Sequence, residues 1–211
     1  MTRSLDRTDL DRVDVETLDE ETVYRGTGKL HRYKVRYRRY DGSWCEPLTR
    51  ELFDTGDAVV VLPYDPVRDE VVLVEQFRIS AYARGVKPWL IECIAGRVGK
   101  DEAPEEVAVR EAREEADCAV VDLIQIGGMF ISPGMIAEYV TMFCARCDSS
   151  TVGGVHGLDD EHEDIRVMAV PFEAALAALE QGRILTSPAF VCLNWLARNR
   201  DNLKRRWIEP R

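Results

Sequence analysis

The segment PEEVAVREAREEA at residues 104–116 most constrains the fold, because it is the first convincing helix pattern in a chain otherwise rich in strand patterns. Proline at its start costs no hydrogen bond, and the two glutamates of the first turn suit the helix dipole. One side of the helix is apolar and is expected to face the core; it comprises Val109, Ala112 and Ala116. The helix therefore predicts a mixed fold in which helices cover a sheet.

Short runs of apolar, mostly β-branched residues on both sides of this helix predict strands. They lie at 58–65, 70–77, 89–96, 120–130 and 138–147, and a last strand, IRVMAVPF, follows an acidic loop at 157–164. Two further helices are expected at 172–182 and 187–207. This order predicts an α/β or α+β fold with a mixed sheet and helices around it.

The N-terminal part has a different, strand-rich character. Basic residues alternate with aromatic or aliphatic ones around Asp41-Gly42, which predicts a hairpin within residues 22–53. Residues 1–20 are charged and lack periodicity, so they are expected to be flexible or loosely packed. We therefore expect a small N-terminal β-rich subdomain at 1–55 and a main domain at 56–211.

The composition excludes several classes of partner. The formal net charge is -10, with 38 acidic and 28 basic residues, so binding to polymeric nucleic acid is not expected. No apolar run reaches the 18 residues or more of a membrane span, and the polar N-terminus lacks the apolar region of a secretory signal.

The cysteines indicate a reducing compartment. Most have apolar neighbours, as buried thiols do; they are Cys45, Cys93, Cys118, Cys144, Cys147 and Cys192. Cys144 and Cys147 form a CxxC pair, but it lies in a strand pattern without a second pair. Structural thiols in a cytoplasmic protein are favoured over a zinc or redox site.

Three glutamates of the predicted helix share one sector about 100° wide, at roughly 100° per residue. They are Glu111, Glu114 and Glu115. Like charges at this spacing repel one another, and a divalent cation such as Mg²⁺ would remove that cost. A solvated acidic face is the alternative, and the helix considered alone favours it.

The wider spacing favours the cation. From Gly96 the sequence follows the pattern G-x5-E-x7-R-E-U-x-E-E, and seven positions match in register: Gly96, Glu102, Arg110, Glu111, Ala112, Glu114 and Glu115. This pattern is similar to the Nudix box. One position departs, because Asp117 stands where the box has a glycine that ends the helix in the left-handed region. Aspartate tolerates that region better than most residues do, so we expect the substitution to be tolerated.

The resemblance extends over residues 21–207, where the chain resembles the bacterial ADP-ribose pyrophosphatase branch of the Nudix family. The stretches that carry it are ETVYRG (21–26), LPYDPVRDEVVLVEQFRISAY (62–82), PWLIECIAG (88–96), SPG (132–134) with Glu138, and the acidic loop. The resemblance implies a Nudix fold, a mixed sheet sandwiched between helices. It also implies hydrolysis of ADP-ribose to AMP and ribose 5-phosphate, with Mg²⁺ as cofactor and Mn²⁺ able to substitute.

Site residues follow from the same resemblance. The metal ligands fall on the carbonyl of Ala95 and on Glu111, Glu115 and Glu163. Glu161 matches the general base and completes, with Glu111 and Glu115, the catalytic set. The substrate-binding positions are Arg50, Arg78, Ser132 and Glu138. A solvated loop is the alternative for Glu161 and Glu163, and a strand salt bridge with Glu51 or Glu75 is the alternative for the two arginines.

Two features leave the substrate open. Thr27-Gly28 stands where the family commonly places an aromatic that stacks on adenine, so the base is undecided. Another nucleotide sugar such as GDP-mannose is therefore an alternative substrate, and a non-catalytic nucleotide-binding sensor is an alternative function. The resemblance also implies a homodimer whose N-terminal strands exchange between subunits.

Overall fold

The computed structural model describes residues 9–158 and 162–208, and the chain divides into two compact units. The first unit comprises Met1–Gly56 and Ser132–Glu138, and the second comprises Asp57–Ile131 and Tyr139–Arg211.

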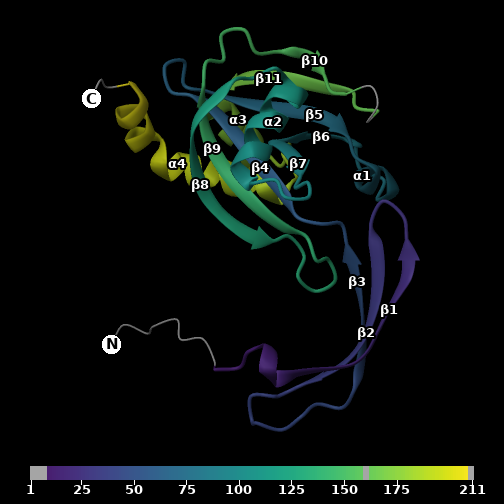
Figure 1. The fold of residues 1–211 in the computed structure, drawn as a ribbon. Helices are drawn as coiled ribbons and strands as arrows, with labels where there is room; N and C mark the ends of the chain where they lie inside the picture. Colours follow the sequence, from purple (N-terminus) through teal and green to yellow (C-terminus); the bar gives the residue numbers. More distant parts are fainter. Residues whose placement is uncertain (1–8, 159–161, 209–211) are drawn as a thin grey trace, which may run out of the picture. The chain divides into compact units, whose positions relative to one another are not determined.

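The first unit is built on an antiparallel three-stranded sheet (Figure 1). A short 3-10 helix, η1 (Arg12–Asp14), precedes β1 (Val15–Arg25), β2 (Lys29–Tyr37) and β3 (Leu48–Asp54). The hairpin expected around Asp41-Gly42 is confirmed: Gly42 has φ +81°, and an antiparallel bridge between Arg38 and Trp44 flanks the turn. Beyond this loop, β2 and β3 pair in antiparallel fashion, beginning with Val35 opposite Leu48.

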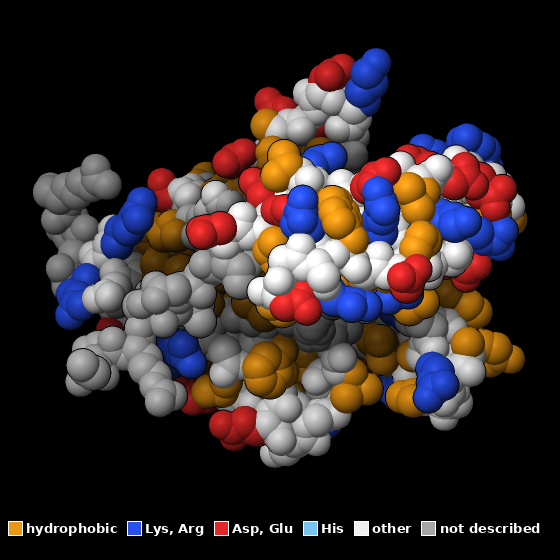
Figure 2. Space-filling model, turned by 90° about the horizontal axis from the view of Figure 1, so that it is seen from below, with side chains coloured by type: hydrophobic (Ala, Val, Ile, Leu, Met, Phe, Trp, Pro, Cys, Tyr) orange, Lys and Arg blue, Asp and Glu red, His pale blue; other side chains and the backbone are white. Residues whose placement is uncertain are grey.

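The expectation that residues 1–20 are flexible or loosely packed is wrong for their second half, which forms η1 and the start of β1. This stretch is ordered by cross-strand charge pairs: Arg36 Nε donates to Glu16 at 2.6 Å, and Arg38 Nε lies 3.3 Å from Asp14. The space-filling view likewise shows basic, acidic and hydrophobic side chains interleaved on one face of the molecule (Figure 2). Because charged pairs hold this strand, it carries no apolar alternation in the sequence.

The second unit contains an eight-stranded sheet: six strands follow the order β10-β11-β5-β4-β9-β8, and the other two are β6, which pairs with β5, and β7, which pairs with β4. The strands are β4 (Ala58–Asp65), β5 (Glu70–Phe77), β6 (Trp89–Glu92), β7 (Ile94–Arg97), β8 (Val120–Phe130), β9 (Tyr139–Cys147), β10 (Gly154–His156) and β11 (Ile165–Pro171). Only β4 and β9 run parallel among these pairs, so the predicted mixed sheet is confirmed.

The run 89–96, expected as one strand, is two strands that separate at Cys93. β6 pairs with β5, whereas β7 pairs with β4, so the chain crosses from one neighbour to the next within a few residues. An apolar run gives no signal for such a change of partner.

Three helices cover the two faces of this sheet (Figure 1): α2 (Pro104–Ala116) lies on one face, and α3 (Phe172–Glu180) and α4 (Ser187–Ile208) lie on the other. The short helix α1 (Ile79–Ala83) follows β5 and buries no residue. Alternate residues of β4 separate two cores: Val59 and Val61 pack with α2, whereas Val60 and Leu62 pack with α3 and α4. None of the described helices is long and apolar enough to cross a membrane.

The helix α2 is rotated relative to the expectation. Ala112 and Ala116 are buried as predicted, but Val109 is 44% exposed, and Val107 and Ala108 take its place in the core. This rotation also carries Glu115 inside, where it is 2% exposed. The helix therefore buries a carboxylate in the position of an apolar residue.

The end of α2 has the geometry expected of the box glycine. Asp117 has φ 43° and ψ 34°, in the left-handed region, and its N–H donates to the carbonyl of Arg113 at 3.0 Å. The N–H of Cys118 then reaches back to the carbonyl of Ala112 at 2.9 Å. Aspartate thus ends the helix as glycine would, at some cost in backbone strain.

Replacing Asp117 with glycine should stabilise the protein, because glycine adopts the left-handed region without strain. We expect the free energy of unfolding to rise by roughly 0.5–1 kcal/mol, since the greater freedom of glycine in the unfolded chain offsets part of the gain. Urea denaturation measures this change. Asp117→Ala is the matched control and should be destabilised; an equal stability of the two variants would contradict the strain argument.

Candidate active site

The Glu111 side chain of α2 lies directly over position 96 of β7, where glycine leaves room for it. A Cβ on Gly96 would lie 1.7 Å from Oε1 of Glu111, which is less than any van der Waals contact. The pairing of β7 with β4 fixes the position of Gly96, which lies opposite Val59. The absent side chain is therefore what gives the Glu111 carboxylate its space.

Arg110 connects three carboxylates of the acidic pattern. Its Nε donates to Glu102 at 2.9 Å, and its Nη1 donates to Glu111 at 2.7 Å and to Glu114 at 2.8 Å. The same contacts lower the pKa of Glu102, mainly through the hydrogen bonds from Arg110. One guanidinium thus offsets much of the repulsion among these glutamates.

Glu115 is the most perturbed acid of the cluster. Burial raises its pKa to about 8, and the charges of Glu111 and Glu163 act in the same direction. Its Oε2 accepts the backbone N–H of Ala95 at 3.1 Å, which lowers the pKa in part. Burial also raises the pKa of Glu111, although Arg110 opposes the shift. The two carboxylates therefore lie in a poorly solvated place where a second negative charge is unfavourable.

Arg78 lies close enough to this cluster to lower the pKa of Glu115. Its Nε donates to Glu92 on β6 at 2.7 Å, and burial raises the pKa of Glu92 against the effect of Arg78. The alternative partner of the sequence analysis, Glu75, instead binds Lys87 and Arg166. Arg78 is thus held in place by a half-buried acid, and its charge acts on the buried Glu115.

Glu163 is fixed by the start of the acidic loop. Its carboxylate accepts the N–H of Leu158 at 3.2 Å, and Gly157, with φ +111°, passes so close that an added Cβ would lie 2.6 Å from Cβ of Glu163. The influence of Glu163 on the pKa values of Glu111 and Glu115 brings it to the same cluster. Glu161 lies outside the described residues.

Three expected substrate-binding residues belong to the first unit. Arg50 is on β3 and donates from Nη1 to the carbonyl of Thr49 at 3.1 Å, while Glu51 pairs with Arg32. The Ser132 carbonyl accepts N–H groups in a turn, and Glu138 accepts the Thr55 hydroxyl at 3.5 Å. The cluster of the second unit is therefore formed by Glu111, Glu115, Glu163, Arg110 and Arg78.

Comparison with known families decides what this cluster belongs to. The model of the NUDIX domain matches residues 54–190, which include Gly96, the acidic helix and the acidic loop. The chain belongs to the Nudix family.

Relatives within the Nudix family have two kinds of name. The chain is 42% identical over 185 residues to the ADP-ribose pyrophosphatase of Escherichia coli (strain K12), covering 88% of each chain. It is 36% identical over 160 residues to the GDP-mannose pyrophosphatase of Pectobacterium atrosepticum, covering 74% of this chain and 79% of that one. The chain is also similar to a solved structure of an ADP compounds hydrolase, with a TM-score of 0.65 at 18% identity. The match covers 92% of this chain and 98% of that one, so the expected fold is confirmed.

The donor atoms of this Nudix site suit a hard divalent cation. Gly96 leaves a cradle beside Glu111, the carbonyl of Ala95 belongs to the strand that faces α2, and Glu115 is a buried carboxylate with only one hydrogen bond among the described residues. In the conformation described here, however, Arg110 holds Glu111, and no three acidic, histidine or cysteine side chains of residues 9–158 and 162–208 converge on one point. The groups fit a cation in kind, and Glu111 must turn from Arg110 to bind it.

Two supports of the site were not assigned from the sequence: Glu92 was left open between a partner of the site residues and a charge at the edge of a strand, and Gly157 was given no role. The pairing of Glu92 with Arg78 depends on the crossing from β6 to β7, which the apolar run concealed. Gly157 could have been singled out as the glycine before the acidic loop. The cysteines of the CxxC pair lie on β9, as the strand pattern predicted, and all six cysteines are buried free thiols.

The raised pKa of Glu115 predicts how stability depends on pH when no metal is bound. The unfolded chain ionises Glu115 near pH 4.5, whereas the folded protein holds the proton to about pH 8. Its contribution to stability is therefore complete below pH 4.5 and is lost as pH rises to 8. In EDTA, Glu115→Gln should be more stable than the parent protein at pH 8, by on the order of a few kcal/mol, and this difference should shrink toward pH 5.

Denaturant titrations from pH 5 to 8 measure this difference. Glu105→Gln, which removes an exposed glutamate from the first turn of α2, is the control and should show no such trend. A difference between Glu115→Gln and the parent that stays constant across the range would show that Glu115 is not buried as a protonated acid.

Proposed function

We propose that this protein hydrolyses the pyrophosphate bond of ADP-ribose to AMP and ribose 5-phosphate, with Mg²⁺ as cofactor and Mn²⁺ able to substitute. The observation that carries the proposal is the set of glutamates Glu111, Glu115 and Glu163 beside Arg78. The 42% identity to an ADP-ribose pyrophosphatase over 88% of both chains supports the choice of substrate.

The proposed ligands of the cation are the carbonyl of Ala95 and the carboxylates of Glu111, Glu115 and Glu163. When bound, the ion neutralises the diphosphate and lowers the pKa of the attacking water. Binding removes the proton from Glu115, because a protonated carboxyl is a poor ligand. The positive charge of the ion would thereby offset both the burial of Glu115 and its repulsion by Glu111 and Glu163.

The protein itself orients the substrate and moves the proton. Arg78, held by Glu92, presents its guanidinium to the diphosphate, where two parallel hydrogen bonds suit the phosphate oxygens. We assign Glu161, by its position in the family pattern, to accept the proton of the attacking water. Arg50, Ser132 and Glu138 of the first unit are proposed to contact the rest of the substrate.

Replacing Glu111 with glutamine tests the metal assignment. The amide keeps the size of the side chain but loses the charge, so turnover should fall by about two or more orders of magnitude while the fold stays intact. Hydrolysis assays with circular dichroism measure both quantities. Glu105→Gln changes the net charge by the same amount and should retain activity, so it is the control. Unchanged turnover in Glu111→Gln would refute the assignment.

The nearest alternative is hydrolysis of another nucleotide sugar. The 36% identity to a GDP-mannose pyrophosphatase favours it, although over a smaller part of the chain. Thr27 in place of an aromatic residue also leaves the contact with the base undecided. We favour ADP-ribose because the corresponding relative matches at higher identity and coverage.

A substrate panel distinguishes the two. We expect kcat/KM for ADP-ribose to exceed that for GDP-mannose and other nucleoside diphosphate sugars by at least about tenfold, since one lost polar contact costs that much. Phosphate-coupled assays with Mg²⁺ and Mn²⁺ measure it, and a reaction in ¹⁸O water locates the phosphorus that is attacked. A preference for GDP-mannose would overturn the proposed substrate but retain the chemistry.

A non-catalytic nucleotide sensor is the second alternative. Proteins of that kind have no need of a charged cluster, whereas here Glu111, Glu114 and Glu115 are all present and Glu115 is buried at a cost in stability. This cost supports a catalytic role.

We propose further that the protein is a cytoplasmic homodimer in which residues 1–55 exchange between subunits and contribute to both sites, while residues 56–211 form the catalytic domain. The free thiols of all six cysteines support a reducing compartment. Analytical ultracentrifugation should therefore find a dimer of about twice the 24.0 kDa chain mass. A fully active monomer would contradict the exchange.

A further inference from the structure

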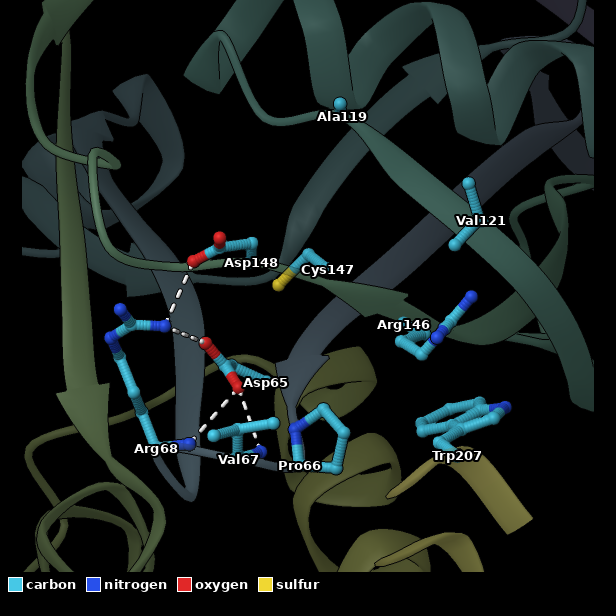
Figure 3. A pocket seen from close by; sticks show the side chains of 10 residues that line it. All are labelled: Asp65, Pro66, Val67, Arg68, Ala119, Val121, Arg146, Cys147, Asp148 and Trp207. Carbon is cyan, nitrogen blue, oxygen red and sulfur yellow. Dashed lines mark hydrogen bonds and ion pairs between the residues drawn. The ribbon is translucent and has the colours of Figure 1, made fainter. Parts of the chain in front are cut away.

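A polar cavity lies among β8, β9 and the end of α4, apart from the acidic cluster. It has a volume of about 240 Å³ and is lined by Asp122, Arg146, Arg206 and Trp207. A larger cavity of about 500 Å³ shares Arg146 and Trp207 with it. Figure 3 shows these two side chains next to each other on one side of the larger cavity, with the ion-paired Asp65, Arg68 and Asp148 on the opposite side.

Two N–H groups at this place have no acceptor. Nε1 of Trp207 and Nε of Arg146 are both shielded from solvent, and neither has a hydrogen-bond partner within the described part of the chain. The Trp207 side chain is itself only 9% exposed. Buried donors without acceptors are unfavourable, so an acceptor from outside the chain would be stabilised here.

The charges around these donors favour an anion. Nη2 of Arg146 pairs with Asp122 at 2.9 Å, which leaves its Nε unused. Arg206 is exposed and has no ion pair or hydrogen bond to any residue that the structure describes. Two guanidinium groups and one carboxylate therefore line the cavity, and the charge of its lining is positive by one. A phosphate oxyanion matches this set, because guanidinium binds it through two parallel hydrogen bonds.

The larger cavity adds an apolar surface to this polar one. Pro66, Val67, Ala119 and Val121 line it together with the face of Trp207 (Figure 3). A ligand with a phosphate group and an apolar body could place each part in the cavity that suits it, because Arg146 and Trp207 border both.

This place is separate from the candidate active site. On β4, Val60 lies opposite Ala95 of β7, whereas Tyr64 lies opposite Arg146 of β9 on the other edge. Four residues along a strand span about 13 Å, and the two strand spacings between β7 and β9 add about 10 Å across the sheet. A phosphate bound at Arg146 therefore does not occupy the acidic cluster.

We propose that Arg146, Arg206 and Trp207 form a second binding site, which takes the phosphate group of a small organic phosphate whose apolar part lies in the neighbouring cavity. Arg206 is exposed and donates to the phosphate directly, whereas the shielded Nε of Arg146 and Nε1 of Trp207 each donate one hydrogen bond after a small rotation of the side chain. The proposal does not depend on the reaction catalysed at the acidic cluster.

Calorimetric titration of the full chain with phenyl phosphate and with inorganic phosphate, both in EDTA, tests the site. Arg206→Gln should weaken the Kd for both ligands at least about tenfold, and Trp207→Phe should weaken it about threefold to tenfold, since each removes charged or neutral donors to an anion. Arg205→Gln is the matched control: this neighbour is exposed on the same turn, hydrogen-bonds Asn202 and does not line the cavity, so its Kd should stay within about twofold.

Thermal unfolding of each variant verifies that it is folded before titration, and Arg206→Gln changes only an exposed side chain. Binding that is equal in the parent protein and in Arg206→Gln would place the phosphate elsewhere and overturn the proposal. The absence of binding to the parent protein up to about 10 mM would overturn it as well. Phenyl phosphate must bind more tightly than inorganic phosphate; equal affinities would refute the role of the apolar cavity.

Discussion

The burial of Glu115 between α2 and β7 is the constraint on which the candidate site depends. A carboxylate that is 2% exposed is costly unless it is protonated or paired, and its pKa of about 8 expresses that cost. The helix accepts it because the neighbouring backbone is unusually close: Gly96 has no side chain to obstruct Glu111, and the N–H of Ala95 reaches Glu115. The acidic helix and the glycine six residues before Glu102 are thus parts of one packing arrangement.

The sheet determines where that backbone lies. β4 pairs with β9 on one edge and with β5 and β7 on the other, and its alternate residues enter both cores. Its register opposite β7 places Ala95 across from Val60 and Gly96 across from Val59. A shift of one residue would turn Ala95 and Gly96 to the opposite faces, and Glu115 would lose its hydrogen bond. The register of a buried strand is therefore as much a part of the site as the glutamates are.

The sequence predicted the features that repeat along the chain and missed those that depend on partners. The bounds of α2 followed from Pro104 and the position of Asp117, and β4 and β5 followed from their β-branched runs. The strand that begins at Val15 was missed because ion pairs with β2 hold it, and a pair such as Glu16 with Arg36 is 20 residues apart in the chain. The predicted buried side of α2 was wrong for a related reason. A glutamate gives no apolar signal in the sequence even when it is buried, so Val109 was assigned to the core in place of Glu115. The residue types of the site were predictable, whereas the pairing of Arg78 with Glu92 required the fold.

Two groups already balance part of the charge of the acidic cluster, and the proposed cation must displace both. Arg110 pairs with Glu102, Glu111 and Glu114 through one guanidinium and offsets part of their negative charge, and a proton neutralises Glu115 at neutral pH. A divalent ion that takes Glu111 and Glu115 therefore competes with a hydrogen bond of 2.7 Å and with a bound proton. The cluster must therefore bind the ion more weakly than the carboxylates of Glu111, Glu115 and Glu163 would if none of them were paired or protonated. The affinity for the ion must also rise with pH as Glu115 loses its proton. The arginine that allows the glutamates to crowd on α2 is thus also the group that would limit how tightly the proposed cation is held.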